Sequence, residues 1–161
     1  MKMHIAVAVA LMATALTGLA QLSGNITISG TVANSTSITV ASQAGYNTLD
    51  IANGVTAQLV AIATETSNDK NGYTVKLTTA NAPAGTAAFL KGTAGNTDQA
   101  PYTMTYNGVA VTLVAGSATV TTAGAKTGSG GVAKNLNVTI TAVWVNADTY
   151  SDTITLTIAA L

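Results

Sequence analysis

The sequence contains no cysteine, no arginine and a single histidine, His4. Without cysteine the chain has no disulfide framework, which many small exported domains use for stability. The chain that follows His4 has neither histidine nor cysteine, which acid–base and nucleophilic catalysis commonly use. A glycosidase that uses two carboxylates is formally possible, because it needs only acidic side chains. Most of the acids fall in predicted turns, however, where aspartate commonly hydrogen-bonds its own backbone. We therefore expect no enzyme, no cofactor and no catalytic residue.

Phosphate and metal sites have little support in the sequence. The segment Gly124-Ala125-Lys126-Thr127 lacks the glycine that a phosphate loop places directly before its lysine. Asp148 and Asp152 could share a calcium ion, yet their spacing matches no known calcium loop. Turn residues explain both aspartates better, and we expect no metal site.

Charge is scarce, at 7% of residues. Without Lys2, five lysines face six acids, so no basic face is available to displace counterions from a nucleic acid. We therefore expect no nucleic-acid partner. A weakly charged chain with a mean hydropathy of +0.41 is prone to associate, which we interpret as a hint that self-association is its purpose. The alternative is an ordinary exported domain whose surface is covered by threonine, serine and asparagine.

The first residues have the order of a secretory signal peptide: Lys2, an apolar run from Ile5 to Leu19, then the small residue Ala20. A membrane-spanning helix would need about 20 continuous apolar residues, and polar or small residues interrupt this run. We therefore expect a signal peptide at residues 1–20 and no membrane span in the mature chain. The mature protein is expected to be secreted, passing through the periplasm to the cell surface or an extracellular filament.

Strict alternation of apolar and polar residues dominates the rest of the chain. It is clearest in Tyr73–Thr78, Leu136–Trp144 and Thr153–Ile158, and it is typical of strands with one face in a core. Val55–Glu65 is apolar on both parities in its middle, which indicates a central strand. No stretch has a convincing helical period. These patterns predict an all-β antiparallel sandwich at residues 34–161.

Asn107-Gly108 predicts a two-residue hairpin turn, because both residues readily adopt the positive φ that a type I′ turn requires. The turn would pair Tyr106 with Val109, and further along Met104 with Val111 and Tyr102 with Leu113. We also expect a turn at residues 68–72 and a flexible loop at 123–134. The aromatic residues on apolar parities are expected to pack in the core rather than form a sugar-binding platform: Tyr73, Tyr102, Tyr106 and Trp144.

The segment 21–33, at the start of the predicted mature chain, also alternates like a strand. One parity carries Leu22, Gly24, Ile26, Ile28, Gly30 and Val32, and the other is polar. Either it is the first strand of its own sandwich, or it is lent to a neighbouring subunit by β-strand addition. A strand passed head to tail in this way would build an open filament.

Three segments resemble the spore coat protein U family, which includes subunits of archaic chaperone–usher pili: Gly24–Val32, Ser67–Val75 and Thr149–Ile158. The resemblance implies an immunoglobulin-like sandwich that lacks one strand. A periplasmic chaperone would fill the gap first, and after passage through an outer-membrane usher the next subunit's N-terminal segment would fill it. By position, the resemblance implies that the side chains inserted into the neighbour's groove are those of Leu22, Ile26, Ile28 and Val32. Gly24 and Gly30 would lie where that groove is shallow. Many members carry a cysteine early in the first strand and another later, and Ser37 stands in such a region here. The loss of that bridge favours a self-complete monomeric relative with a longer or complete core.

The expectation is therefore an exported structural subunit of a fimbria-like filament, assembled as a head-to-tail homo-oligomer through Leu22, Gly24, Ile26, Ile28, Gly30 and Val32. The alternative is a self-complete monomeric β-sandwich that acts as an adhesin, a lectin-like module or a matrix or coat protein. Loops composed mainly of glycine, alanine, threonine and asparagine favour the structural role over the binding module.

Overall fold

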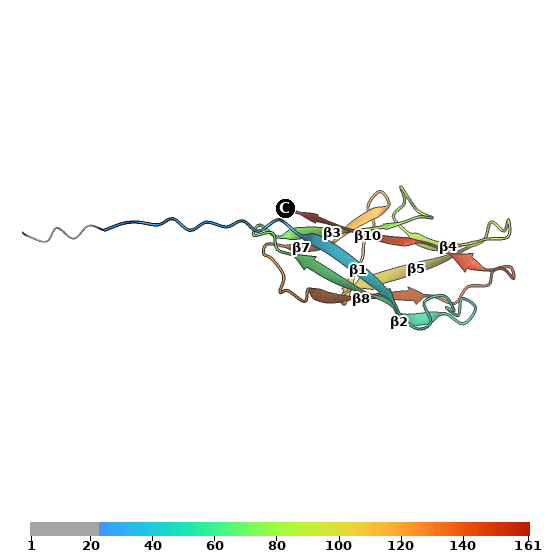
Figure 1. Cartoon of the computed structure of the whole chain (residues 1–161). Coiled ribbons are helices and arrows are strands. Elements are labelled where there is room, and N and C mark those ends of the chain that lie inside the picture. Colours follow the sequence, from blue (N-terminus) through green and yellow to red (C-terminus); the bar gives the residue numbers. More distant parts are fainter. Residues whose placement is uncertain (1–22) are drawn as a thin grey trace, which may run out of the picture. The chain divides into compact units, whose positions relative to one another are not determined.

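The computed structural model describes residues 23–161, so the predicted signal peptide (1–20) and Leu22 lie outside the described residues. Within that range the chain is all-β, with ten strands in two antiparallel sheets and no helix (Figure 1). The described part thus holds no helix that could cross a membrane. This architecture agrees with the predicted fold class at the level of an all-β protein consistent with a β-sandwich.

The larger sheet has seven strands, and the smaller sheet has three. The larger runs in the order β1-β2-β8-β5-β4-β9, with β6 paired to β5; the smaller runs β10-β3-β7. The bounds in the larger sheet are β1 (Thr36–Ser42), β2 (Val55–Ser67), β4 (Ala88–Gly92), β5 (Gln99–Tyr106), β6 (Val109–Ala110), β8 (Val132–Ile140) and β9 (Tyr150–Ser151). Those in the smaller sheet are β3 (Tyr73–Thr79), β7 (Ser117–Ala123) and β10 (Ile154–Ala160).

The core consists of the inward parities that the alternation predicted. In β3, Tyr73, Val75 and Leu77 are buried, and the lysine between the last two is exposed. In β8 the buried positions are again every second residue, from Leu136 to Ile140. Both sheets contribute to one apolar cluster, so the core lies between them.

β2 is a central strand, as predicted, with β1 on one side and β8 on the other. Its pairing with β8 shifts register between Leu59 and Ala61, which is a β-bulge or similar irregularity. Such a shift turns two successive side chains toward the same face. Val60 and Ala61 are accordingly both buried, which explains the apolar run on both parities.

The hairpin at Asn107-Gly108 is confirmed, with φ values of 50° and 81° and with Tyr106 paired to Val109. The predicted pairing of Tyr102 with Leu113 is wrong, because Tyr102 pairs with Ala88 of β4 instead. β4 and β6 thus share one edge of β5, so the hairpin ladder ends after Val111, whose N–H donates to the Met104 carbonyl. The turn at 68–72 is confirmed, and the loop between β7 and β8 is shorter than expected, at 124–131.

The prediction that Trp144 packs in the core is wrong, since its side chain is 96% exposed. β8 ends at Ile140, the last residue paired with both β2 and β5. Beyond it the chain leaves the sheet, and the Val143 N–H donates to the Ile51 carbonyl in the loop between β1 and β2. The alternation in the sequence therefore extends past the strand that it describes.

A buried carboxylate joins the two sheets and is the polar feature that the sequence analysis missed. Glu65 of β2 is fully buried. Its Oε1 accepts hydrogen bonds from the Tyr106 hydroxyl (2.7 Å) and the Thr121 hydroxyl (2.8 Å), and its Oε2 accepts one from the Tyr73 hydroxyl (3.0 Å). These donors come from β5, β7 and β3. We call Glu65, Tyr73, Tyr106 and Thr121 the Glu65 cluster.

The buried tyrosines predict that the fold loses stability in alkali. Burial, aided by the hydrogen bond to Glu65, raises the pKa of Tyr73 to about 12, and burial likewise raises the pKa of Tyr102 and Tyr106. In an unfolded chain tyrosine ionises near pH 10, roughly. Between these values the unfolded chain releases protons that the folded chain keeps, so the free energy of unfolding falls as pH rises.

We therefore expect the midpoint of urea unfolding to hold steady below about pH 9 and to fall from about pH 10 to pH 12. Near-ultraviolet absorbance of tyrosinate, followed beside circular dichroism, checks that ionisation and unfolding coincide. A midpoint that stayed constant up to pH 12 would contradict the burial of these hydroxyls.

Candidate strand-acceptor groove

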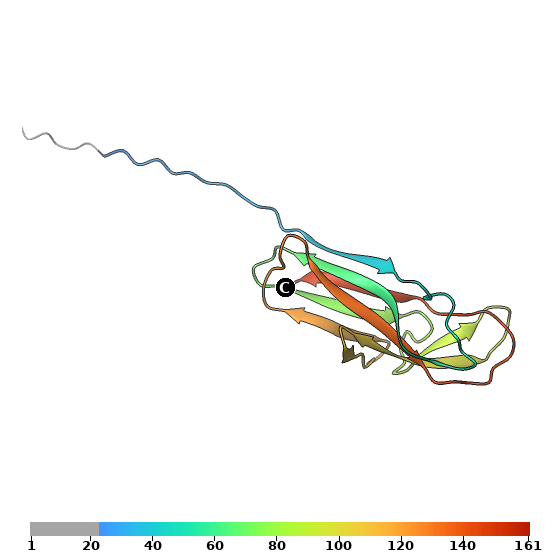
Figure 2. The same cartoon turned by 90° about the horizontal axis from the view of Figure 1, so that it is seen from below.

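The two sheets leave one side of the domain open between β1 and β10. β1 is the edge strand of the larger sheet and β10 is the edge strand of the smaller one. The two strands lie next to each other but form no ladder (Figure 2). An edge strand presents unpaired N–H and C=O groups and invites a further strand. This opening is therefore the place where another chain could add to the fold.

An apolar groove of about 210 Å³ lies in this opening. Its walls come from β1 and the loop that follows it, and from β10. Its floor comes from the core faces of β2, β4, β5 and β8. The lining residues are Val40, Ser42, Tyr46, Leu49, Val60, Ala61, Leu90, Tyr102, Leu136, Val138, Asp152, Ile154 and Leu156.

The groove leaves aliphatic side chains of its walls partly in contact with solvent. Ile154 and Leu156 pack against the core cluster, and both are only half-buried. Across the groove, Val40 is 53% exposed. Each aliphatic side chain that an added strand covered would contribute roughly 1.5–3 kcal/mol. The groove is thus a continuation of the core that lacks a cover on one side.

One end of the groove is polar. The Asp152 carboxylate accepts hydrogen bonds from the Tyr102 hydroxyl (2.8 Å) and from the backbone N–H groups of Asn81 (3.0 Å) and Thr153 (2.7 Å). These donors fix the carboxylate in the corner before β10. Burial, followed by the hydrogen bond to Asp152, raises the pKa of Tyr102. The hydrogen bonds hold both side chains in place at this end of the groove.

The predicted donor residues lie outside both sheets. In the described part of segment 21–33, residues 23–32 belong to no strand and are exposed throughout. The exposed fractions of Ile26, Ile28 and Val32 are 86%, 88% and 90%. The first strand of the domain begins only at Thr36. We call residues 23–32 the arm.

The residues that follow the arm are fixed firmly to the domain. The Asn68 amide donates to the Ala33 carbonyl (2.8 Å), and its oxygen accepts from the Ser35 N–H (2.7 Å). The Asn34 amide donates to Asp69 (2.6 Å). The turn between β2 and β3 thus holds Ala33–Ser35 at the start of β1.

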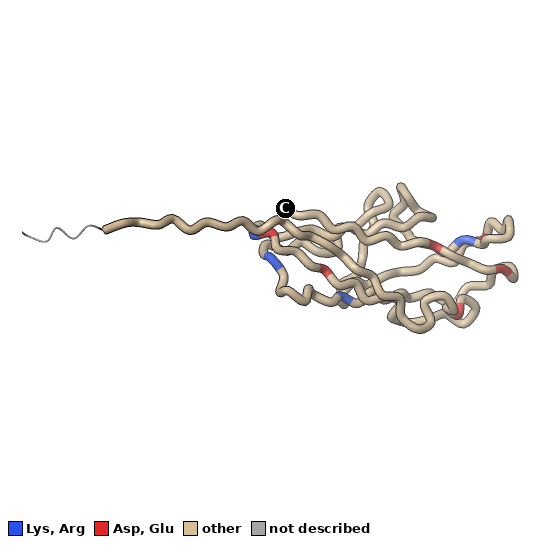
Figure 3. The backbone as a smooth tube through the Cα atoms, viewed as in Figure 1, with Lys and Arg blue, Asp and Glu red and all other residues tan. Residues whose placement is uncertain are grey.

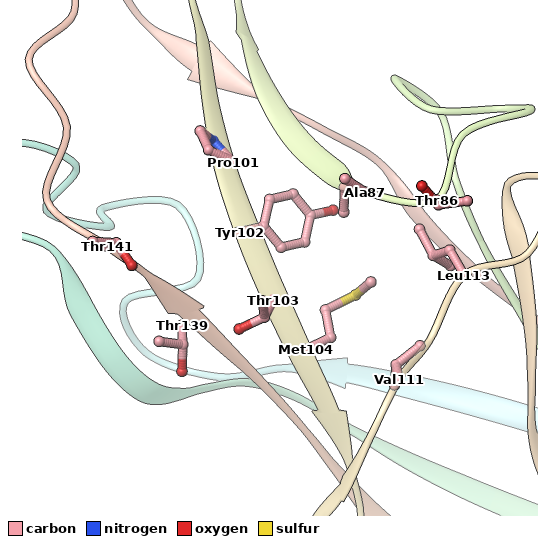
Figure 4. A pocket seen from close by; sticks show the side chains of 11 residues that line it. Thr86, Ala87, Pro101, Tyr102, Thr103, Met104, Val111, Leu113, Thr139 and Thr141 are labelled. Carbon is pink, nitrogen blue, oxygen red and sulfur yellow. The ribbon is translucent and has the colours of Figure 1, made fainter.

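A second hollow, of about 270 Å³, lies where the edge of β5 passes from β4 to β6 (Figure 4). Thr103, Thr139 and Thr141 border it on one side, and Met104 extends toward Val111 and Leu113. None of its lining residues carries a charge, and the hydroxyl of Tyr102, which also lines it, donates to Asp152. Among the described residues, no three His, Cys, Asp or Glu side chains come together as metal ligands.

Fold and groove together define the class as an all-β protein of two antiparallel sheets, open between β1 and β10. Compared with known proteins, the chain matches no family model, and a search of curated proteins finds no match. The arm and the groove therefore carry the functional argument themselves.

Proposed function

We propose that this protein is an exported structural subunit of a cell-surface filament, in which the arm of one subunit adds as a β-strand to the groove of the next. The observation that carries the proposal is complementarity within one chain. The same chain carries both an exposed segment with aliphatic side chains on one parity and an apolar groove bordered by an unpaired strand edge. In this proposal the domain is an immunoglobulin-like sandwich, one strand short.

The groove offers both kinds of interaction that strand addition needs. The free edge of β10 would supply backbone hydrogen bonds, which give affinity without depending on sequence. The aliphatic floor and walls would take alternate side chains, here Ile26, Ile28 and Val32, and so provide specificity. Thr27, Ser29 and Thr31 would then face outward. The added strand would extend the smaller sheet from three strands to four.

The attachment of the arm favours insertion into a neighbour over insertion into its own groove. Hydrogen bonds to Asn68 and Asp69 hold Ala33–Ser35 in place. To enter its own groove the arm would have to reverse direction before Ala33. Such a reversal would take Gly30 and Val32 out of the inserted strand and shorten the apolar contact.

The resemblance to the spore coat protein U family supplies the rest of the proposal. A periplasmic chaperone would cover the groove before assembly, and an outer-membrane usher would release the subunits to the surface. The predicted signal peptide fits this route, because both partners act after export.

Size on an unheated SDS gel tests the proposed function directly. Protein collected from the cell surface is expected to give a ladder of SDS-resistant multimers that collapses to one band on boiling. The joint resists SDS because strand and groove together bury aliphatic side chains and a backbone ladder. A single monomer band without heating, with light scattering of the native protein also giving a monomer, would instead indicate a self-contained surface domain.

A further inference from the structure

The exposed tryptophan lies among acidic loops at one end of the domain. Three loops form this loop end: residues 43–54, 93–98 and 141–149. The Val143 N–H donates to the Ile51 carbonyl, and the Asn146 N–H donates to Asp98 (2.8 Å), so the loops are held together. Trp144 is the only tryptophan of the chain, and it borders a hollow of about 330 Å³ beside Asp50 and Asp148.

Acidic residues dominate the charge of the loop end. Asp50, Asp98 and Asp148 lie in its three loops, and Lys91 lies on β4, the strand that precedes the loop 93–98. Hydrogen bonds from Asn53 lower the pKa of Asp50, so its carboxylate is charged at neutral pH. An indole that is 96% exposed beside carboxylates is unusual, since aromatic side chains of this size are mostly buried.

The opposite end of the domain carries exposed lysines. Lys70 lies in the turn that holds Ala33–Ser35, and Lys126 lies in the loop that bonds to Ser67. Asp69, at the same place, is already bonded to Asn34 and Asn71. We call the turn 68–72, the loop 124–131 and Ala33–Ser35 the arm end. Figure 3 shows lysines at the arm end and acidic residues gathered toward the loop end.

The directions of the strands decide which ends would meet in a filament. β1 starts at the arm end, where Thr36 pairs with Ser67, and β10 finishes there, where the Leu161 N–H donates to the Gly72 carbonyl. Both existing pairs of the smaller sheet are antiparallel, and antiparallel pairing is slightly more stable per residue. An inserted arm antiparallel to β10 runs toward the loop end, so its Val32 emerges there.

We propose that the loop end of one subunit, which carries Trp144, docks against the arm end of the next subunit. Lys70 and Lys126 of the arm end would then face the aspartates of the loop end, Asp50, Asp98 and Asp148. This inference rests on the proposed function, since the inserted arm brings the two ends together. Charge complementarity of this kind orients partners and speeds their encounter. Tryptophan is also one of the side chains enriched among those that contribute most of the binding energy of an interface. The contact would fix the angle between neighbouring subunits.

Fluorescence of the single tryptophan tests the inference. Filaments of the full chain are compared with the monomeric Ile26→Asp/Ile28→Asp variant, in which Trp144 is unchanged. On assembly we expect the emission to shift to shorter wavelength and quenching by acrylamide to fall several-fold. The double variant Lys70→Glu/Lys126→Glu should form the SDS-resistant ladder yet regain much of the quenching. Lys76→Glu, a charge reversal in the middle of β3, is the matched control and should behave as the wild type.

The outcomes separate this inference from the proposed function. A ladder in which Trp144 is quenched as readily as in the monomer would overturn the docking contact and leave strand addition standing. Absence of the ladder would overturn both. Trp144 could also stay protected from acrylamide in filaments of the Lys70→Glu/Lys126→Glu variant and in 1 M salt. That result would overturn the charge-matched arrangement. Protection of Trp144 in the monomer by added saccharides, without protection in filaments, would assign the loop end to glycan binding instead.

Discussion

Replacing both Ile26 and Ile28 with aspartate is expected to abolish multimers. In the proposed joint these two side chains lie against the apolar groove. Removing them from it costs about 3–6 kcal/mol, or roughly 10²–10⁴-fold in the affinity of the joint, before any cost of placing carboxylates there. The measurement is the ladder on an unheated SDS gel, with circular dichroism to show that the domain remains folded.

The arm offers a matched control on its other parity. Thr27→Asp/Ser29→Asp adds the same two charges to the same segment, but on the side chains that would face solvent. We expect this control to retain the ladder. Equal loss of assembly in both variants would mean that charge anywhere in the arm is harmful, and the alternating insertion would be wrong.

Complementation between a defective arm and a defective groove identifies the two partners of the joint. Leu156→Asp places a carboxylate in the wall of the groove and leaves the arm intact. Alone, neither Leu156→Asp nor Ile26→Asp/Ile28→Asp should form a ladder. Mixed before assembly, they should give one dimer and nothing longer, because one variant supplies the arm and the other supplies the groove. Absence of that dimer, with both proteins folded, would place the acceptor surface elsewhere.

Local patterns in the sequence were enough to predict several of the strands and one hairpin turn. The period of two identified the buried faces of β3 and β8, and Asn107-Gly108 fixed the hairpin, because both depend on residues close together in the chain. The pairing of Tyr102 with Ala88 was not predictable in this way. Two segments competed for the same edge of β5, and local patterning does not rank them.

The groove could not be read from the sequence for the same reason. Val40 and Leu156 each lie in an alternating segment, but their approach across the opening depends on the order of strands in two sheets. At Trp144 the local pattern predicted too much, because the alternation continues after β8 has ended and the side chain is exposed. Glu65 did leave a signal: it shares the inward parity of Ala61 and Ala63 in β2. A carboxylate on an inward parity indicates a buried hydrogen-bonded site.

The Glu65 cluster gives the second large effect. Glu65→Ala would leave the hydroxyls of Tyr73, Tyr106 and Thr121 without their shared acceptor and open a cavity between the sheets. The Tyr73 and Tyr106 hydroxyls are buried, and each buried hydroxyl left unpaired costs about 1–3 kcal/mol. For these two alone we expect the free energy of unfolding to fall by about 2–6 kcal/mol, and the cavity adds to this loss. That is a large part of the 5–15 kcal/mol, roughly, that holds a domain folded.

Urea unfolding of the monomeric Ile26→Asp/Ile28→Asp protein, with and without the change at Glu65, measures this loss free of assembly. Glu65→Gln is the matched control, because its carbonyl oxygen keeps one acceptor in nearly the same place, and it should lose clearly less stability than Glu65→Ala. The alkaline profile supplies a second readout. Because the hydrogen bond to Glu65 contributes to the raised pKa of Tyr73 and Tyr106, both hydroxyls should ionise at lower pH in Glu65→Ala. Equal stability of the two variants, together with unchanged tyrosine titration, would show that Glu65 fills space in the core without organising the hydroxyls around it.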